Sequence, residues 1–208
     1  MTLTLRPYQN QAMKERPILF SAPMVRAILD GSKTQTRRVA TMRVCGGKII
    51  DVPSDNDAQW VQRVADKRYG KPGDRLWVRE TWAVQHEYDA AAPSEIGSNA
   101  RWHYAATEDL GGLRKRPSIF LPRRGSRIRL EITGVRVERL QQISEADAIA
   151  EGCPLINPNP FILGHGASSA SGWFSQLWED INGSGSWDAN PWVWVIEFRR
   201  PGTLPEAP

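Results

Sequence analysis

Cysteine and histidine are scarce in this chain. Its 208 residues include two cysteines and three histidines. Cys45 and Cys153 do not stand in paired motifs, so the sequence does not support a disulfide framework. The histidines, His86, His103 and His165, lack the spacing of metal ligands. We therefore expect no metal and no cofactor.

Long hydrophobic runs are also missing. No stretch of about 18 or more apolar residues occurs, which disfavours a membrane-spanning helix. The first residues lack the apolar core of a signal peptide. These absences predict a cytoplasmic protein that has no membrane partner.

The overall composition is that of a globular protein with a substantial core. Hydrophobic residues make up 40% and charged residues 24% of the chain. The net charge of +4 permits a nucleic-acid or nucleotide partner without requiring one. Nine tryptophans are present, and Trp77, Trp82 and Trp102 among them can either fill a core or stack on a base.

The most informative motif is the sequence GSKTQTRR, which begins at Gly31. It follows an amphipathic run at 23–30 that is typical of a helix ended by glycine. The residues after Gly31 alternate with a period of two, which indicates a strand. Such a strand has two faces, formed by Lys33, Gln35 and Arg37 on one side and by Thr34, Thr36 and Arg38 on the other. These groups can bind a polyanion, or activate a hydroxyl nucleophile beside an amine.

Regular elements are predicted along most of the chain. Strand signals occur at 18–20, 33–39, 60–64, 75–82, 102–106, 127–140 and 192–198. Helix signals occur at 23–30, 143–152 and 173–181. Within the longest strand signal, Gly134 breaks the alternation and predicts a bulge or bend. The irregular mixture disfavours a parallel doubly wound sheet. It favours an α+β fold, a mixed β-barrel flanked by short α-helices.

We expect a single domain at residues 17–200. A loose arm at 1–16 precedes it, and a frayed tail at 201–208 follows it. Insertions are expected near 45–70, 85–120 and 154–170, and the stretches 85–100 and 108–118 look like surface loops.

Basic residues form several clusters besides the arginine pair of the motif. The candidate nucleic-acid contacts among them are Arg114, Lys115, Arg116, Arg123 and Arg124. Each cluster alone fits a solvated face, whereas all of them together favour an anion-binding surface.

These features resemble the ASCH domain family, which has a PUA-like β-barrel fold. The resemblance rests mainly on Gly31, Lys33, Thr34, Thr36 and Arg38. The turn at 71–74, the helix at 143–152 and the apolar strand at 192–198 support it. The resemblance covers residues from about 17 to 200. The chain looks most like the larger, tryptophan-rich members that are found in phage and prophage genomes.

The resemblance implies that the chain binds RNA or a modified nucleoside. One small bacterial branch of the family hydrolyses the acetyl amide of acetylcytidine. Its lysine, threonine and glutamate match Lys33, Thr36 and Glu151. This chain is about twice as long as that branch, so its insertions could reshape the pocket.

The chemistry of amide hydrolysis gives each residue a role. Thr36 attacks, Lys33 takes its proton if its pKa is lowered, and Glu151 orients the lysine, binds the substrate amine or activates water. Glu151 would also raise the pKa of Lys33, so burial must outweigh it. Strict alternation puts Lys33 and Thr36 on opposite faces, and they converge only if the glycine turn or a bulge rotates Lys33. Substrate-binding candidates are Thr34, Arg37, Arg38, Trp77 and Glu80.

Other interpretations of the same residues stay open. Lys33 and Glu151 can be a plain ion pair that ties a strand to a helix. The chain can be a non-catalytic RNA-binding module, a ribonuclease, or a phage accessory protein acting through protein contacts. For a ribonuclease, the usual histidine pair is not evident.

Overall fold

The computed structural model describes residues 13–40, 42–43, 49–50, 64, 67–154 and 169–202, with the backbone alone at 42–43 and 49–50. Most of the expected arm, the tail beyond 202 and much of the insertions near 45–70 and 154–170 lie outside these residues. Residues 60–63 of an expected strand, Cys45 and His165 also lie outside them. Val64, the last residue of that expected strand, is helical.

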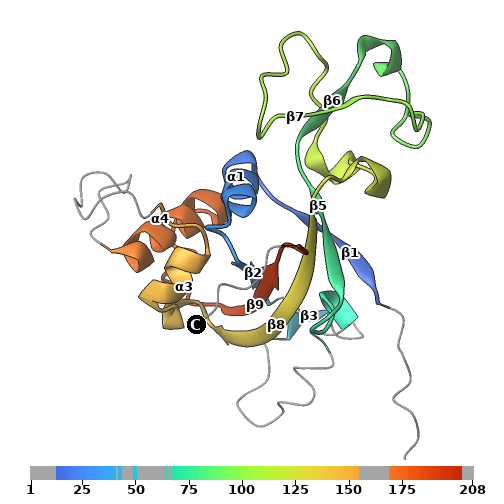
Figure 1. The fold of residues 1–208 in the computed structure, drawn as a ribbon. Coiled ribbons are helices and arrows are strands. Elements are labelled where there is room, and N and C mark those ends of the chain that lie inside the picture. The colour runs from blue at the N-terminus through green and yellow to red at the C-terminus, as the bar shows by residue number, and fades with distance from the viewer. Residues whose placement is uncertain are drawn as a thin grey trace, which may run out of the picture.

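A five-stranded sheet forms the centre of the fold (Figure 1). Its order is β1 (Glu15–Leu19), β5 (Arg75–Arg79), β8 (Arg129–Arg139), β9 (Trp192–Arg199) and β2 (Gln35–Val39). β1 runs parallel to β5, and the other neighbouring pairs are antiparallel. Two-stranded sheets pair β3 (Met42–Arg43) with β4 (Ile49–Ile50) and β6 (Trp82–Val84) with β7 (Trp102–Tyr104). The chain is thus of the predicted α+β class.

Two positions in the sheet bear directly on the sequence predictions. The register of β8 against β9 shifts between Ile132 and Gly134, so the predicted irregularity at Gly134 is confirmed. A Cβ there would lie 2.5 Å from Glu197 Oε2, so the end of the Glu197 side chain would have to shift to admit one. β1 starts at Glu15, so the expected loose arm is wrong at its last two residues.

Three α-helices lie where the sequence predicted them. They are α1 (Ala22–Asp30), α3 (Glu145–Ala150) and α4 (Ala170–Asn182). α1 ends at Gly31, whose φ of 88° is left-handed and favours glycine. Ser144 caps α3 by accepting a hydrogen bond from the Asp147 N–H. Figure 1 shows α3 and α4 together on one side of the sheet, with α1 nearby.

β9 is buried on both faces, which explains its unbroken apolar sequence. Trp194, Ile196 and Phe198 join one hydrophobic cluster with residues of α1, β5 and β8. Val193 and Val195, which alternate with them, join a second cluster with residues of α3 and α4. The first cluster packs α1 against the sheet, and the second packs α3 and α4 against it.

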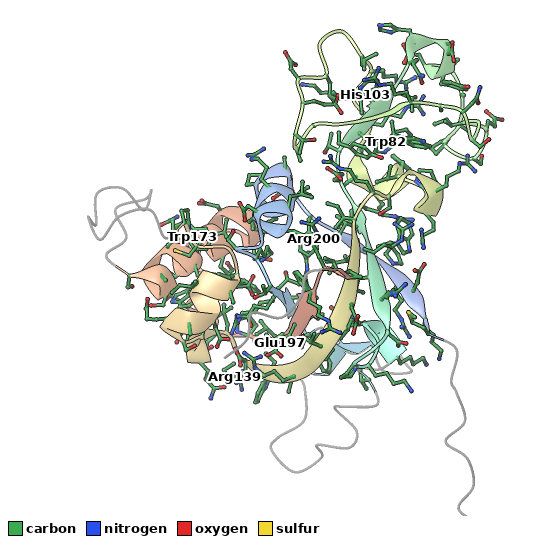
Figure 2. The ribbon with its side chains drawn as sticks, in the orientation of Figure 1. Trp82, His103, Arg139, Trp173, Glu197 and Arg200 are labelled. Atoms are coloured by element: carbon green, nitrogen blue, oxygen red, sulfur yellow. The ribbon has the colours of Figure 1, made fainter. Side chains whose placement is uncertain are left out.

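Residues 82–125, here called the upper lobe, have a small core of their own. This core contains Trp82, Val84, Ile96, Ala100 and Leu121. Figures 1 and 2 show the lobe set apart from α3 and α4, with Trp82 and His103 inside it and Trp173 near the helices. The predicted loops at 85–100 and 108–118 contain no strand or α-helix and are mostly exposed or half-buried, but Ile96 and Ala100 of the first loop pack into this core.

Candidate functional site

The end of α1 delivers Lys33 to the end of α3. The Lys33 N–H donates to Ala27 O, and the next N–H, of Thr34, donates to Ala150 O at 2.8 Å. Lys33 and Glu151 form an isolated antiparallel bridge between the two segments. Because of this bridge, the regular strand β2 begins only at Gln35, two residues later than predicted.

Lys33 and Glu151 are joined by side chains as well as by backbone. Lys33 Nζ donates to Glu151 Oε2 at 2.7 Å and to the Glu151 carbonyl at 2.8 Å. The two residues are 2% and 4% exposed, so the pair is buried. Two residues 118 positions apart in the sequence thus meet as predicted.

The alternation along the motif has its predicted consequence. Lys33, Gln35 and Arg37 all reach α3 or its C-terminal residue. Gln35 Nε2 donates to the carbonyl and carboxylate of Asp147 at 2.8 and 3.0 Å. Arg37 lies between three carboxylates, those of Glu138 at 2.5 Å, Asp147 at 3.3 Å and Glu151 at 3.1 Å.

Burial and neighbouring charges shift the pKa values of Lys33 and Asp147 in opposite directions. Burial lowers the pKa of Lys33, and the nearby Glu151 carboxylate opposes that effect without outweighing it. Burial raises the pKa of Asp147, but hydrogen bonds from Gln35 and Ser144 and the charge of Arg37 outweigh it and lower the pKa to about 2. The pKa of Lys33 is therefore shifted in the direction that favours a general base.

A cavity of about 470 Å³ adjoins the network. Its polar wall includes Thr36, Arg37, Arg38 and Glu151. Its apolar wall comes from Phe20 and Met24 and from a face of α4 that contains Phe174, Leu177, Trp178 and Ile181. Thr81 and Ser118, at the base of the upper lobe and within it, also line the cavity.

A second cavity of the same volume, about 470 Å³, lies beside the first. The two share Ser21, Met24, Glu151, Leu177 and Ile181. Lys33 lines neither of them and stands behind Glu151, with Nζ 5.9 Å from the centre of the Phe20 ring. Thr36 and Glu151 therefore face the same cavity, and Lys33 meets it through Glu151.

Arg38 differs from Arg37 although the two are adjacent. Its Nη2 donates to the Leu19 carbonyl at 2.6 Å, and its guanidinium lies 5.4 Å from the Phe20 ring centre. Within the described parts of the chain it has no carboxylate at ion-pair distance. Burial lowers its pKa.

Three predicted substrate-binding residues lie elsewhere. Trp77 is packed on β5, 7% exposed, under the guanidinium of Arg79. Both Glu80 oxygens accept hydrogen bonds from Arg127 at 2.9 Å. Thr34 is exposed and lines a separate hollow of about 210 Å³. None of the three lines the cavity that holds Thr36, so the structure does not bring these predicted substrate-binding residues to it.

The basic residues of the upper lobe mostly serve its own structure. Arg116 is 8% exposed and donates to the carbonyls of three residues at 88–91, so its assignment to nucleic acid is wrong. Arg114 and Arg124 are exposed but also donate to backbone carbonyls. Arg123 pairs with Glu15 across to β1. Lys115 is exposed.

Sequence reasoning missed several members of the site. Glu138 carries no local signal, because its role depends on pairing between β8 and its neighbours. Asp147 was assigned only to the helix start, where it indeed completes the capping of Ser144. Trp178 lies on the predicted apolar face of α4, and that spacing alone cannot distinguish a cavity wall from a filled core.

Among the described residues, no cluster of three or more histidine, cysteine, aspartate or glutamate side chains has the arrangement of a metal site. Their helices include none with the length and apolar character needed to cross a membrane. No family model, no curated protein and no solved structure matches the chain, so its function has to follow from the chemistry of the site itself.

Proposed function

We propose that the chain is an ASCH-type protein that binds a nucleoside in the cavity beside Thr36 and hydrolyses an acyl amide on the base. One observation carries this proposal. Glu151, whose buried carboxylate is paired with Lys33, borders a cavity that a threonine of the same motif also lines. An amine, a hydroxyl and a carboxylate are the three groups that the reaction needs.

A PUA-like barrel is the fold that we propose with it. β1 and β2 are the two ends of the five-stranded sheet. Arg38 of β2 nevertheless donates to the carbonyl of Leu19 in β1 at 2.6 Å. Contact between opposite edges of a sheet supports a curled sheet over a flat one.

The proposed reaction transfers the acyl group through Thr36. The Thr36 hydroxyl oxygen attacks the acyl carbon, and its proton passes to the Lys33–Glu151 pair. The carbon–nitrogen bond then breaks, the exocyclic amine of the base takes that proton, and an acyl ester remains on Thr36. Water attacks the ester, releases the carboxylic acid and restores the hydroxyl.

Release of cytidine from acetylcytidine tests the proposal. We expect Thr36→Val and Lys33→Ala each to lower the rate at least 100-fold, the scale of losing a nucleophile or its base. Thr34→Val is the matched control, because it removes an exposed hydroxyl of the same motif that does not line the cavity. Full activity in Thr36→Val would refute the assigned nucleophile.

Binding without turnover is the second candidate. Both oxygens of Glu151 already have partners, Arg37 on Oε1 and Lys33 on Oε2, as in a plain structural ion pair. This candidate predicts that cytidine binds while acetylcytidine stays intact. A ribonuclease is the weaker alternative. His86 and His103, the two histidines within the described residues, pair with Asp89 and Glu108 and do not line the cavity.

A further inference from the structure

Arg37 and Arg38 present a contrast that the proposed reaction does not use. Arg37 has no exposed side-chain surface and is matched by three carboxylates. Arg38 is half-buried and borders the same cavity, where it contacts one carbonyl and one aromatic ring. Glu151 and Tyr69 attract its charge from a greater distance, and within the described residues no carboxylate pairs with it directly. Taking a cation partly out of water without a directly paired opposite charge costs free energy. An anion entering the cavity would offset that cost.

A second donor in the cavity wall also lacks a partner. Trp178 is 5% exposed and lines the cavity. Its buried indole N–H has no hydrogen-bond acceptor within the part of the chain that the structure covers. Trp178 comes from α4 and Arg38 from β2, so two elements contribute donor-bearing side chains to the wall of one hollow. The indole nitrogen itself is covered, so Arg38 is the group that an anionic ligand would meet.

We propose that the ligand of this cavity is a nucleotide, a nucleoside that carries a phosphate, and that Arg38 binds the phosphate. This inference rests on the proposed function and narrows its substrate class. Guanidinium groups bind phosphate with strong, directional hydrogen bonds. Within the described structure, the hydrogen bond of Arg38 to the Leu19 carbonyl uses Nη2. Thr36 and Arg38 are two residues apart on one face of β2, about 7 Å along a strand. The reacting base and the phosphate would thus lie side by side on that face.

The phosphate could belong to a free nucleotide or to a link in an RNA strand. Calorimetric titration with cytidine, cytidine 5′-monophosphate and the cytidine dinucleotide separates these sources. We expect both phosphorylated ligands, or the monophosphate alone, to bind at least 10-fold more tightly than cytidine. Tight binding of the dinucleotide assigns the site to RNA, and preference for the monophosphate assigns it to free nucleotides.

Arg38→Gln tests the assigned residue, and we expect it to bring all ligands to the affinity of cytidine. Arg199→Gln is the control, because it removes the same charge from an exposed arginine that pairs with Glu131. If Arg38→Gln fails to fold, Arg38→Lys and the salt dependence of the wild type replace it, and the preference should weaken with salt.

Equal binding of cytidine and its monophosphate would overturn the inference and leave the proposed function standing. A phosphate preference that survives in folded Arg38→Gln would also overturn it. Failure of all three ligands to bind would overturn the proposed function itself.

Discussion

Glu151 holds the charge balance of the site at the scale of single residues. Its two oxygens accept hydrogen bonds from Lys33 at 2.7 Å and from Arg37 at 3.1 Å. Removing one partner of a buried pair costs more than the pair contributes, because the remaining charge stays buried. Glu151 pairs with two cations, whereas Lys33 pairs with one carboxylate. Loss of the Glu151 charge and loss of the Lys33 charge should therefore have different effects on stability.

This asymmetry predicts unequal effects on stability. We expect Glu151→Gln to lower the free energy of unfolding by about 3 kcal/mol, because it leaves the buried Lys33 amine without its carboxylate and near the Arg37 charge. Lys33→Met should cost less, about 1–2 kcal/mol, because Arg37 still balances Glu151. Urea unfolding at neutral pH measures both. Equal losses, or a larger loss in Lys33→Met, would contradict the charge argument.

The pKa of Lys33 gives a second residue-scale prediction. Burial places it below the 10.5 of a free lysine. Between the lowered pKa of Lys33 in the folded chain and the 10.5 of the unfolded chain, Lys33 is protonated only in the unfolded chain. The free energy of unfolding therefore rises with pH across that window. Glu151 favours the charged amine, so Glu151→Gln should move the titration of Lys33 to still lower pH.

NMR titration of the lysine ε-methylene signals, with Lys33→Arg used to assign the resonance, measures this shift without relying on catalysis. A Lys33 midpoint at or above that of the exposed lysines would contradict the effect of burial.

At the scale of elements, the turn after α3 places Gly152 against α1. Gly152 has a φ of 95°, and a Cβ there would lie 3.1 Å from the Ala27 Cβ and 3.3 Å from the Lys33 Cβ. The residue after the lysine–carboxylate bridge therefore has to be small as well as left-handed. The close approach of α1 and the end of α3 depends on this position.

Two glycines with nearly the same φ separate the two requirements. Gly183, after α4, has a φ of 97° and open space around the Cβ position. We expect Gly183→Ala to cost about 1 kcal/mol through backbone strain alone. Gly152→Ala should cost at least about 1 kcal/mol more, because crowding adds to the same strain. Thermal unfolding compares the two variants, and similar melting temperatures would contradict the crowding.

At the scale of the whole molecule, the upper lobe is a second packed unit within one chain. Its centre is Arg116, whose guanidinium lies 5.1 Å from the Trp82 ring centre and donates to carbonyls of the 88–91 segment. Trp82 and Arg116 also exchange backbone hydrogen bonds. Because the lobe has its own core, it can open without unfolding the five-stranded sheet.

Arg116→Gln should therefore loosen the lobe alone. We expect amide hydrogen exchange at 82–125 to speed up at least 10-fold, since the loss of charge-assisted hydrogen bonds exceeds about 1.4 kcal/mol. Exchange in β8 and β9 should not change. Lys115→Gln, at the exposed neighbouring residue, is the control. Faster exchange throughout the sheet would show that the lobe and the sheet unfold together.

Local patterns predicted much of the fold and part of the site. The glycine stop after α1 and the alternation of Lys33, Gln35 and Arg37 depend only on neighbouring residues, so they could be predicted. The meeting of Lys33 with Glu151 came from the resemblance to a family. The role of Arg116 could not be predicted, because nothing in a basic loop tells whether its side chain turns inward. The pairing of Glu80 with Arg127 could not be predicted either, because the two residues lie 47 positions apart in the sequence.

The carboxylate of Glu151 borders two hollows at once. Any molecule that draws Lys33 or Arg37 away from it on one side alters the charge that it presents on the other. Occupancy of either hollow would then change the affinity of its neighbour, and thermodynamic linkage makes the factor the same in both directions.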